Sequence, residues 1–272
     1  MYRACKMNVN TIDKKVIVEI TRVCNLNCEH CLYSEFLNTP TLYMPMEKYI
    51  EIIETFASKG FSRVVLTGGE PTLHPQLIKM SKYARARGFT VSICTNGVIN
   101  MDEEMLIAFP FATFTISLDS HIPEVHDLFR GRKGAFKKTI LFIEKLKQKG
   151  KNVSIHIALG EFNIDRIDET ITYALEFSRE VVLATVYLKN QNDNIEYQSK
   201  LQAVKKRYLL SQEVILVGFA EYCENPDCLY GKNIVFINKD GNSVDCYWKK
   251  NGGKIISIDS ALTRKVVGIE EN

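Results

Sequence analysis

The amino-acid sequence predicts an α/β protein built around a parallel sheet. Short apolar runs rich in β-branched residues alternate with amphipathic helical patterns, which is typical of repeated βαβ units. The predicted strands cover residues 16–20, 63–67, 90–94, 113–118, 153–158 and 181–187. Periodicity leaves open whether they form an open doubly wound sheet or a partial barrel. In both architectures functional sites lie at the carboxyl ends of the strands.

Helical patterns occupy the intervals between these strands. They cover residues 46–59, 75–87, 102–109, 135–149 and 169–178. The patterns at 46–59, 75–87 and 135–149 are followed by Gly60, Gly88 and Gly150. Glycine is the residue that most readily takes the left-handed conformation that ends a helix, so these positions predict the helix ends.

The sequence changes character at the polar stretch 189–194. A helical pattern at 196–210 and an apolar run at 214–220 follow it. A hairpin is then predicted from 234–237 through Lys239-Asp-Gly241, because Asp-Gly between apolar runs favours a tight turn. We therefore expect two domains, residues 1–190 and a small helix-and-hairpin domain at 191–272.

Composition limits the classes of function. The chain has 272 residues, 46% of them hydrophobic, which is enough for a substantial core in a soluble protein. A net charge of +3 gives no reason to expect nucleic acid or an acidic membrane surface as a partner, and no apolar run is long enough to span a bilayer. The eight cysteines occur mainly as two groups of three, which indicates metal sites in a reducing cytoplasm rather than disulfides.

The first cysteine group follows the first predicted strand. Cys24, Cys28 and Cys31 have a C-x3-C-x2-C spacing. A [4Fe–4S] cluster usually takes four thiolates, so three protein ligands would leave one iron free to bind another molecule. Zinc is the alternative metal, although structural zinc sites usually have four protein ligands.

Three further motifs follow the next three predicted strands. They are Thr67-Gly-Gly-Glu-Pro71, Thr95-Asn-Gly97 and Ser117-Leu-Asp119. Together with the cysteine spacing, this order resembles the radical S-adenosylmethionine (radical SAM) enzymes over about residues 14–190. The resemblance implies a partial (β/α)6 barrel. It also implies a [4Fe–4S] cluster and SAM as cofactors, with reductive cleavage of SAM to a 5′-deoxyadenosyl radical that abstracts a substrate hydrogen.

The same resemblance implies roles for individual residues. Cys24, Cys28 and Cys31 would hold the cluster, and Glu70 would pair with the SAM ammonium group. Gly68 and Gly69 would leave room for the cofactor beside the backbone. Other expected SAM contacts are His30 at the adenine, Asn96 and Ser117 at the ribose or carboxylate, Asp119 as a second candidate there, and Arg130 at the carboxylate. For His30 and Arg130 an ordinary structural role is the alternative.

The second cysteine group consists of Cys223, Cys228 and Cys246, the last within Gly241-x4-Cys246. It resembles the start of the SPASM extension of some radical SAM enzymes. No cysteine follows Cys246, so the truncated twitch form with one auxiliary [4Fe–4S] cluster fits better. Either one iron of this cluster is open to bind substrate, or a fourth ligand comes from Cys5, Cys94 or an oxygen donor. Zinc or unligated buried cysteines are the alternatives.

The predicted function is therefore a radical SAM oxidoreductase, reduced by a partner such as flavodoxin or ferredoxin. The expected reaction is oxidation, epimerisation or cross-linking of a ribosomally made peptide. The alternatives are a twitch-type enzyme acting on a sugar alcohol or nucleotide, and a non-catalytic protein that binds a metal cluster. The remaining histidines are expected in local hydrogen bonds or in the core, with His156 facing the barrel interior: His74, His121, His126 and His156.

Overall fold

A parallel sheet forms the centre of the protein. The computed structural model describes residues 14–31, 34, 37–38, 42–99, 109, 112–186, 194–217 and 234–244, and the strand residues 250–251, 254–255 and 264–265. Seven strands follow one another in parallel: β1 (Lys15–Thr21), β2 (Arg63–Gly68), β3 (Thr90–Thr95), β4 (Thr113–Ser117), β5 (Asn152–Leu159), β6 (Val181–Thr185) and β7 (Val214–Val217).

The C-terminal strands extend the other edge of this sheet. β8 (Ile234–Ile237) pairs in parallel with β1, and β9 (Asn242–Val244) and β12 (Arg264–Lys265) continue from it in antiparallel pairs. A separate two-stranded sheet joins β10 (Lys250–Asn251) to β11 (Lys254–Ile255). The strand order runs from β12 to β7, and within the described residues these two end strands do not pair, so the barrel is open.

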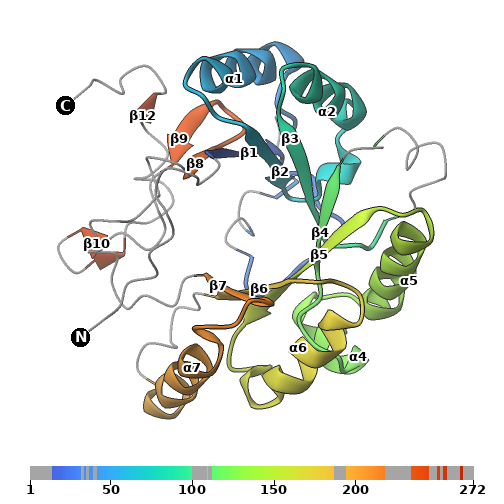
Figure 1. The fold of residues 1–272 in the computed structure, drawn as a ribbon, viewed down its shortest axis with the longest axis vertical. Coiled ribbons are helices and arrows are strands. Elements are labelled where there is room, and N and C mark those ends of the chain that lie inside the picture. The colour runs from blue at the N-terminus through green and yellow to red at the C-terminus, as the bar shows by residue number, and fades with distance from the viewer. Residues whose placement is uncertain are drawn as a thin grey trace.

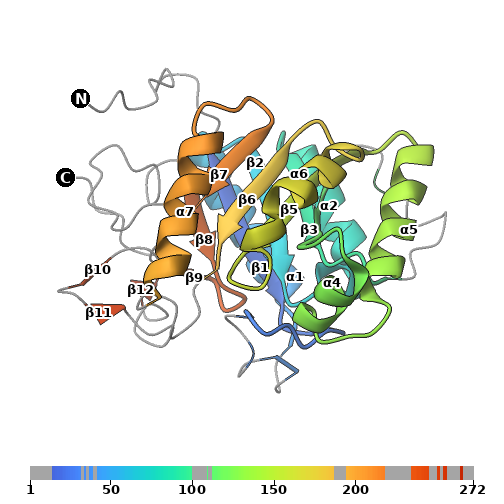
Figure 2. The same ribbon diagram turned by 90° about the horizontal axis from the view of Figure 1, so that it is seen from below.

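Helices cover the outer face of the curved sheet (Figure 1). They are α1 (Met46–Ser58), α2 (Leu77–Ala86), α4 (Pro123–Phe129), α5 (Ala135–Gln148), α6 (Ile167–Leu175) and α7 (Ile195–Tyr208), with short 3-10 turns η3 (Pro71–Leu73) and η4 (Ile164–Arg166). Seen from below, α7 lies beside β7 at one edge of the sheet (Figure 2). Buried side chains such as Phe56, Leu66, Phe114 and Ile143 fill the layer between helices and strands.

The predicted fold class is confirmed, because the structure has the parallel α/β sheet of a partial barrel and not a closed one. All six predicted strands are present within one or two residues of their expected ends. Gly60, Gly88 and Gly150 have positive φ angles of 74°, 87° and 64° and follow their helices as expected. The predicted helix at 102–109 lies outside the described residues except for Phe109, and α4 was not predicted.

The C-terminal strands bear on the expected domain division. β7 and β8 both belong to the same sheet as β1–β6, so the described residues after 190 continue the barrel at each of its edges. The division at residue 190 stays a prediction. None of the helices within the described ranges is long and apolar enough to cross a membrane.

The two faces of the sheet differ in polarity. In β4, Phe114 and Ile116 are fully buried under the helices, whereas Thr113, Thr115 and Ser117 on the inner face are half-buried. On β4 the inner face is therefore polar, in contrast to the apolar outer face.

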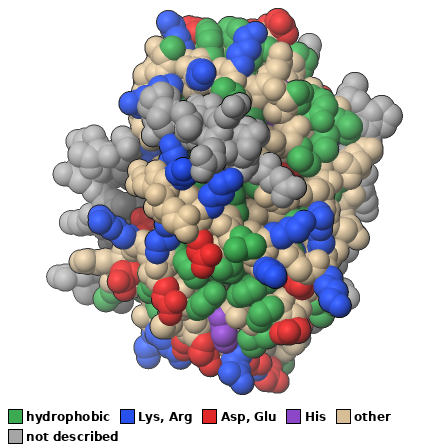
Figure 3. All heavy atoms as spheres, turned by 90° about the vertical axis from the view of Figure 1, so that its right-hand side faces the viewer, with side chains coloured by type: hydrophobic (Ala, Val, Ile, Leu, Met, Phe, Trp, Pro, Cys, Tyr) green, Lys and Arg blue, Asp and Glu red, His purple; other side chains and the backbone are tan. Residues whose placement is uncertain are grey.

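The outer surface is a mixed one. The face over the right-hand side of Figure 1 carries basic and acidic side chains interspersed with hydrophobic ones (Figure 3). Lys147 near the end of α5 is exposed, and so is Lys149 just beyond it.

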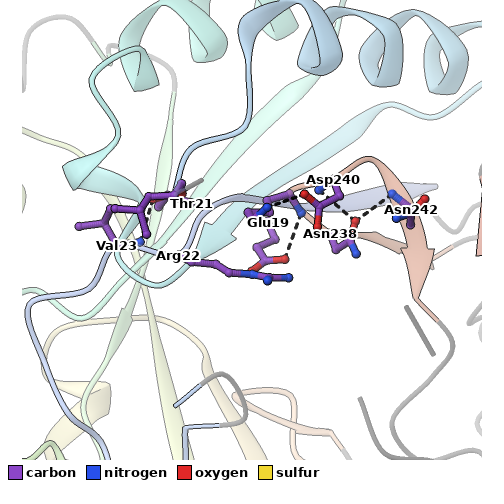
Figure 4. Close-up of polar contacts among 9 residues, drawn as sticks. Glu19, Thr21, Arg22, Val23, Asn238, Asp240 and Asn242 are labelled. Atoms are coloured by element: carbon purple, nitrogen blue, oxygen red, sulfur yellow. Dashed lines mark hydrogen bonds and ion pairs between the residues drawn. The ribbon is translucent and has the colours of Figure 1, made fainter. Parts of the chain in front are cut away.

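A buried carboxylate joins the C-terminal hairpin to the barrel. Glu19, at the inner face near the end of β1, is fully buried and accepts hydrogen bonds from Arg22 Nε at 2.9 Å and from the backbone N–H of Lys239 at 3.0 Å. The Asn238 side chain in turn closes the β8–β9 turn by accepting from the N–H groups of Asp240 and Asn242 (Figure 4). Glu19 therefore fixes the hairpin against the strand that leads into the cysteine loop.

Replacing Glu19 by Gln is expected to lower the free energy of unfolding by about 2 kcal/mol, because the neutral amide cannot form the buried ion pair with Arg22. Urea unfolding of the reduced chain checks this. Glu169→Gln is the control: its pair with Arg166 is exposed and 3.5 Å long, so its loss should change little. Equal effects of the two substitutions would contradict a role for the buried contact.

Candidate active site at the carboxyl end of the sheet

The cysteine loop begins where β1 ends, and the backbone of the next motif holds it there. Gly69 N–H donates to the Thr21 carbonyl at 2.8 Å, and Glu70 N–H donates to the Val23 carbonyl at 2.7 Å. Cys24 follows immediately. The Gly68-Gly69-Glu70 turn after β2 is therefore paired directly with the chain that enters the loop.

This pairing explains the two glycines. A Cβ atom on Gly68 would lie 2.1 Å from the Thr21 carbonyl oxygen, and one on Gly69 would lie 2.3 Å from that of Val23. Gly68 also has a φ of 144°, which other residues rarely adopt. We expected these glycines to make room for a cofactor; in the structure the chain's own backbone occupies that room. Their contact with SAM stays a prediction.

Glu70 is a fully buried carboxylate within a ring of donors. Its Oε1 accepts from Thr72 N–H, Thr72 Oγ1 and Thr95 Oγ1 at 3.1, 2.6 and 2.9 Å, and its Oε2 accepts from Asn96 N–H at 2.8 Å. The carboxylate thus links the turn after β2 to the end of β3. Burial raises the pKa of Glu70, and these hydrogen bonds oppose the rise. Its expected bond to the SAM ammonium stays a prediction.

Three asparagine side chains connect the cysteine loop to its surroundings. Asn96 Nδ2 donates to Asn25 Oδ1 at 2.8 Å, and Asn25 Nδ2 donates to the Val98 carbonyl at 2.6 Å. On the other side, Asn38 Oδ1 accepts from Cys24 N–H at 3.2 Å. Asn96, predicted as a SAM contact, therefore holds the loop in this structure. The sequence offered no signal for Asn25 or Asn38.

Arg130 and Asp119 form a buried ion pair beside Cys28. Arg130 Nε lies 2.6 Å from Asp119 Oδ2, and Arg130 Nη1 donates to Cys28 Sγ at 3.8 Å. Burial by itself would raise the pKa of Asp119, but Arg130 and nearby histidines outweigh it and lower that pKa. The structure thus brings together Asp119, Arg130 and Cys28, three of the predicted site residues.

A stack of aromatic rings lies beside the cysteine loop. His30 stacks on Phe129, with ring centroids 4.3 Å apart, and Phe129 stacks on Phe162 from the loop after β5. Burial is the main cause that lowers the pKa of His30 to about 4, so its ring is neutral at pH 7. His30 Nδ1 is buried and has no hydrogen-bond partner among the described residues.

Ser117 and His156 face the barrel interior. They are neighbours in the register of β4 and β5, and both are half-buried. This confirms the predicted direction of His156. The predicted local roles of other histidines are also confirmed: His74 contacts the Met44 carbonyl and Gln76 N–H, His121 contacts Thr170, and His126 accepts from Asp119 N–H.

The three thiols of the loop, Cys24, Cys28 and Cys31, are half-buried. Burial raises the pKa of Cys24 to about 11, and it raises that of Cys28 against the opposing effect of Arg130. Within the described ranges no three His, Cys, Asp or Glu side chains gather closely enough for a single metal ion. A cube whose thiolates bind separate irons does not require such crowding.

The donor set fits a cluster and SAM. Three thiols lie on one loop, a cationic donor points at one of them, and His30 presents an unsatisfied buried nitrogen beside them. The second predicted metal site cannot be placed in the same way, because Cys223, Cys228 and Cys246 lie outside the described residues, as does Cys5. The auxiliary cluster stays a prediction.

The fold is an open parallel α/β barrel, and three thiols lie on the loop that follows its first strand. Residues 18–174, more than half of the chain, match the Radical SAM superfamily. The chain therefore belongs to the radical SAM superfamily, whose enzymes use a [4Fe–4S] cluster and SAM.

Two curated relatives and one solved structure illustrate the likeness. The chain is 32% identical over 160 residues to the AdoMet-dependent heme synthase of Methanosarcina barkeri, covering 58% of this chain and 46% of that protein. It is 29% identical over 156 residues to the sporulation killing factor maturation protein SkfB of Bacillus subtilis, covering 57% and 38%. Streptococcus suis SuiB bound to S-adenosylmethionine has a similar fold, with a TM-score of 0.67 and 14% identity over 92% of this chain and 66% of that chain. The chain spans less than half the length of the two curated relatives.

Substituting Gly68 by Ala is expected to lower the free energy of unfolding by about 3 kcal/mol or more, because the methyl group would collide with Thr21 and the φ angle is strained. Gly88→Ala is the matched control: Gly88 also has a positive φ but nothing within 4 Å of an added Cβ, so about 1 kcal/mol is expected. Denaturant unfolding of both variants measures the difference. Similar losses would show that the backbone contact contributes little.

His126 is expected to make the protein less stable as the pH falls. Burial is the main cause that lowers its folded pKa to about 4, with Asp119 opposing and Arg130 adding to the shift, whereas an unfolded histidine titrates near about 6.5. Between these values the unfolded chain takes up a proton that the folded chain does not, so stability is lost as pH decreases through this window. His126→Asn, which retains an acceptor for Asp119 N–H, should reduce the slope of unfolding free energy against pH; an unchanged slope would contradict this.

Proposed function

We propose that this chain is a radical SAM enzyme whose cluster is held by Cys24, Cys28 and Cys31, and that it modifies a ribosomally made peptide. The observation that carries the first part is the loop itself. Three thiols follow β1, and the turn after β2 fastens the loop through two backbone hydrogen bonds. The bound cluster supplies one electron for the reductive cleavage of SAM.

The chain's own residues then have three tasks. The Gly68–Gly69 turn and Asn96 hold the loop, so that the thiols stay at the mouth of the barrel. Arg130 keeps a positive charge near Cys28, where it can also meet the SAM carboxylate. His30 presents a neutral, half-buried ring suited to stacking on the adenine. Ser117 and His156 line the interior that a substrate would enter.

Likeness to peptide-modifying proteins supports a peptide substrate. SkfB is named for the maturation of a sporulation killing factor, and SuiB has been solved with its precursor peptide SuiA at a TM-score of 0.66 to this chain. The likeness to an AdoMet-dependent heme synthase favours a second candidate, a small-molecule substrate. We place the reaction in the oxidoreductase class, with flavodoxin or ferredoxin as the reductant. We propose an auxiliary cluster at Cys223, Cys228 and Cys246, with residues 191–272 as the domain that contains it.

Anaerobic reconstitution of the whole chain tests the cluster assignment. The wild type should bind about eight irons if it holds two clusters, falling to about four in the Cys24/Cys28/Cys31→Ala variant, which should also stop releasing 5′-deoxyadenosine from SAM. About four irons falling to almost none would leave one cluster and remove the auxiliary site. Iron content and SAM cleavage that survive the triple substitution would refute the assignment.

The substrate class is tested with the reduced holoenzyme and SAM. A short precursor peptide encoded beside the gene should change when the enzyme turns over, in mass if it is oxidised or cross-linked and in the chirality of a residue if it is epimerised. Neither change should occur with the triple-alanine variant. SAM cleavage stimulated by an iron porphyrin but not by the peptide would instead favour the small-molecule candidate.

A further inference from the structure

We propose that Arg130 sets the reduction potential of the SAM-binding cluster through its hydrogen bond to the Cys28 sulfur, with Asp119 limiting the size of the effect. This inference rests on the proposed function, because it takes Cys28 as a cluster ligand. The step concerned is a one-electron reduction of the cluster by an external reductant, in which no bond forms and no proton moves. Arg130 acts through Cys28 and is therefore a positioning residue.

The geometry places a buried cation between a carboxylate and a thiol. Arg130 is 7% exposed and Asp119 is 0% exposed. The guanidinium contacts Asp119 through Nε at 2.6 Å and Cys28 Sγ through Nη1 at 3.8 Å. The positive end of the ion pair is thus the end nearer to the sulfur.

The arginine is fixed in this orientation from both sides. Asp119 Oδ1 accepts from Ala158 N–H at 2.9 Å, which anchors the carboxylate at the end of β5. The backbone around Arg130 lies against the cysteine loop: Glu29 N–H donates to the Phe129 carbonyl at 3.1 Å.

Gly131 makes this approach possible. It has a φ of 64°, and a Cβ on it would lie 2.1 Å from the Asn27 carbonyl oxygen. The segment from Phe129 to Gly131 therefore touches the loop on both sides of Cys28, at Asn27 and at Glu29, and Gly131 has no room for a side chain. These backbone contacts hold the main chain of Arg130 beside the cysteine loop.

Electrostatics gives the direction of the effect. Reduction adds one negative charge to the cluster and its thiolates, and a positive donor at a ligand sulfur stabilises that charge. Because Arg130 is buried and Cys28 is half-buried, solvent screens their interaction only in part. Arg130 should therefore make the cluster easier to reduce, and Asp119 should offset part of this by its opposite charge.

Arg132 offers a matched control in the same segment. Its Nη1 donates to the Asn25 carbonyl at 3.1 Å, so it holds the same loop with the same kind of side chain but bonds to a backbone oxygen instead of a sulfur. A general effect of loop support would appear in both arginines, whereas an effect through the sulfur would appear only in Arg130.

The test is a redox titration of reconstituted holoprotein, followed by electron paramagnetic resonance in the absence of SAM, so that contacts with the SAM carboxylate play no part. Dithionite serves as the reductant. At a fixed potential, Arg130→Gln should lower the ratio of reduced to oxidised cluster about tenfold, the effect of one charge-assisted hydrogen bond. Asp119→Asn should raise that ratio, and Arg132→Gln should leave it near the wild-type value.

The opposite directions for Arg130 and Asp119 distinguish this role from simple structural damage, which would move both variants the same way. If Arg130→Gln fails to assemble a cluster, the direction of the Asp119→Asn shift decides the matter. Unchanged ratios, or an equal shift in Arg132→Gln, would overturn the inference while the proposed function stands. Iron that is independent of Cys24, Cys28 and Cys31 would instead overturn the proposed function and this inference together.

Discussion

The site depends on the backbone contact between the ends of β1 and β2. The carbonyls of Thr21 and Val23 accept hydrogen bonds from Gly69 and Glu70 at distances that no side chain on Gly68 or Gly69 would allow. Backbone hydrogen bonding between the two chain segments thus continues past the ends of the two strands, and at this junction the backbones lie in close contact. Because the thiol loop starts at that junction, the position of its first cysteine follows from the sheet rather than from the loop alone.

Two buried carboxylates organise the rest of the site, each in a different way. Glu70 is surrounded by hydroxyl and backbone donors that link consecutive strand ends. Asp119 meets a full positive charge and a backbone N–H. A buried carboxylate without such partners would be costly, so each carboxylate is tied to the segments that satisfy it. The motifs at the ends of β2, β3 and β4 therefore also connect neighbouring segments of the structure. A substitution in one of them should alter the conformation of the thiol loop.

The sequence alone predicted most of the barrel and the placement of its motifs, because strand ends can be read from local pattern. β-branched runs and Gly60, Gly88 and Gly150 mark the elements, and the motifs follow the strands. Contacts between distant segments have no such signal. Nothing in the sequence near 234–237 indicates parallel pairing with β1, or that Glu19 accepts from Lys239, 220 positions later. The hydrogen-bond partners of Asn25 and Asn38 could not be predicted from the sequence either, because asparagine is also common in turns.

The polarity of the inner face bears on the kind of chemistry that the barrel permits. Thr115, Ser117 and His156 place polar, half-buried side chains on the inner face of the sheet. Helices cover the opposite face of the same strands. A closed apolar filling would leave no place for a substrate near the thiol loop. Among the described strands the sheet stays open between β7 and β12.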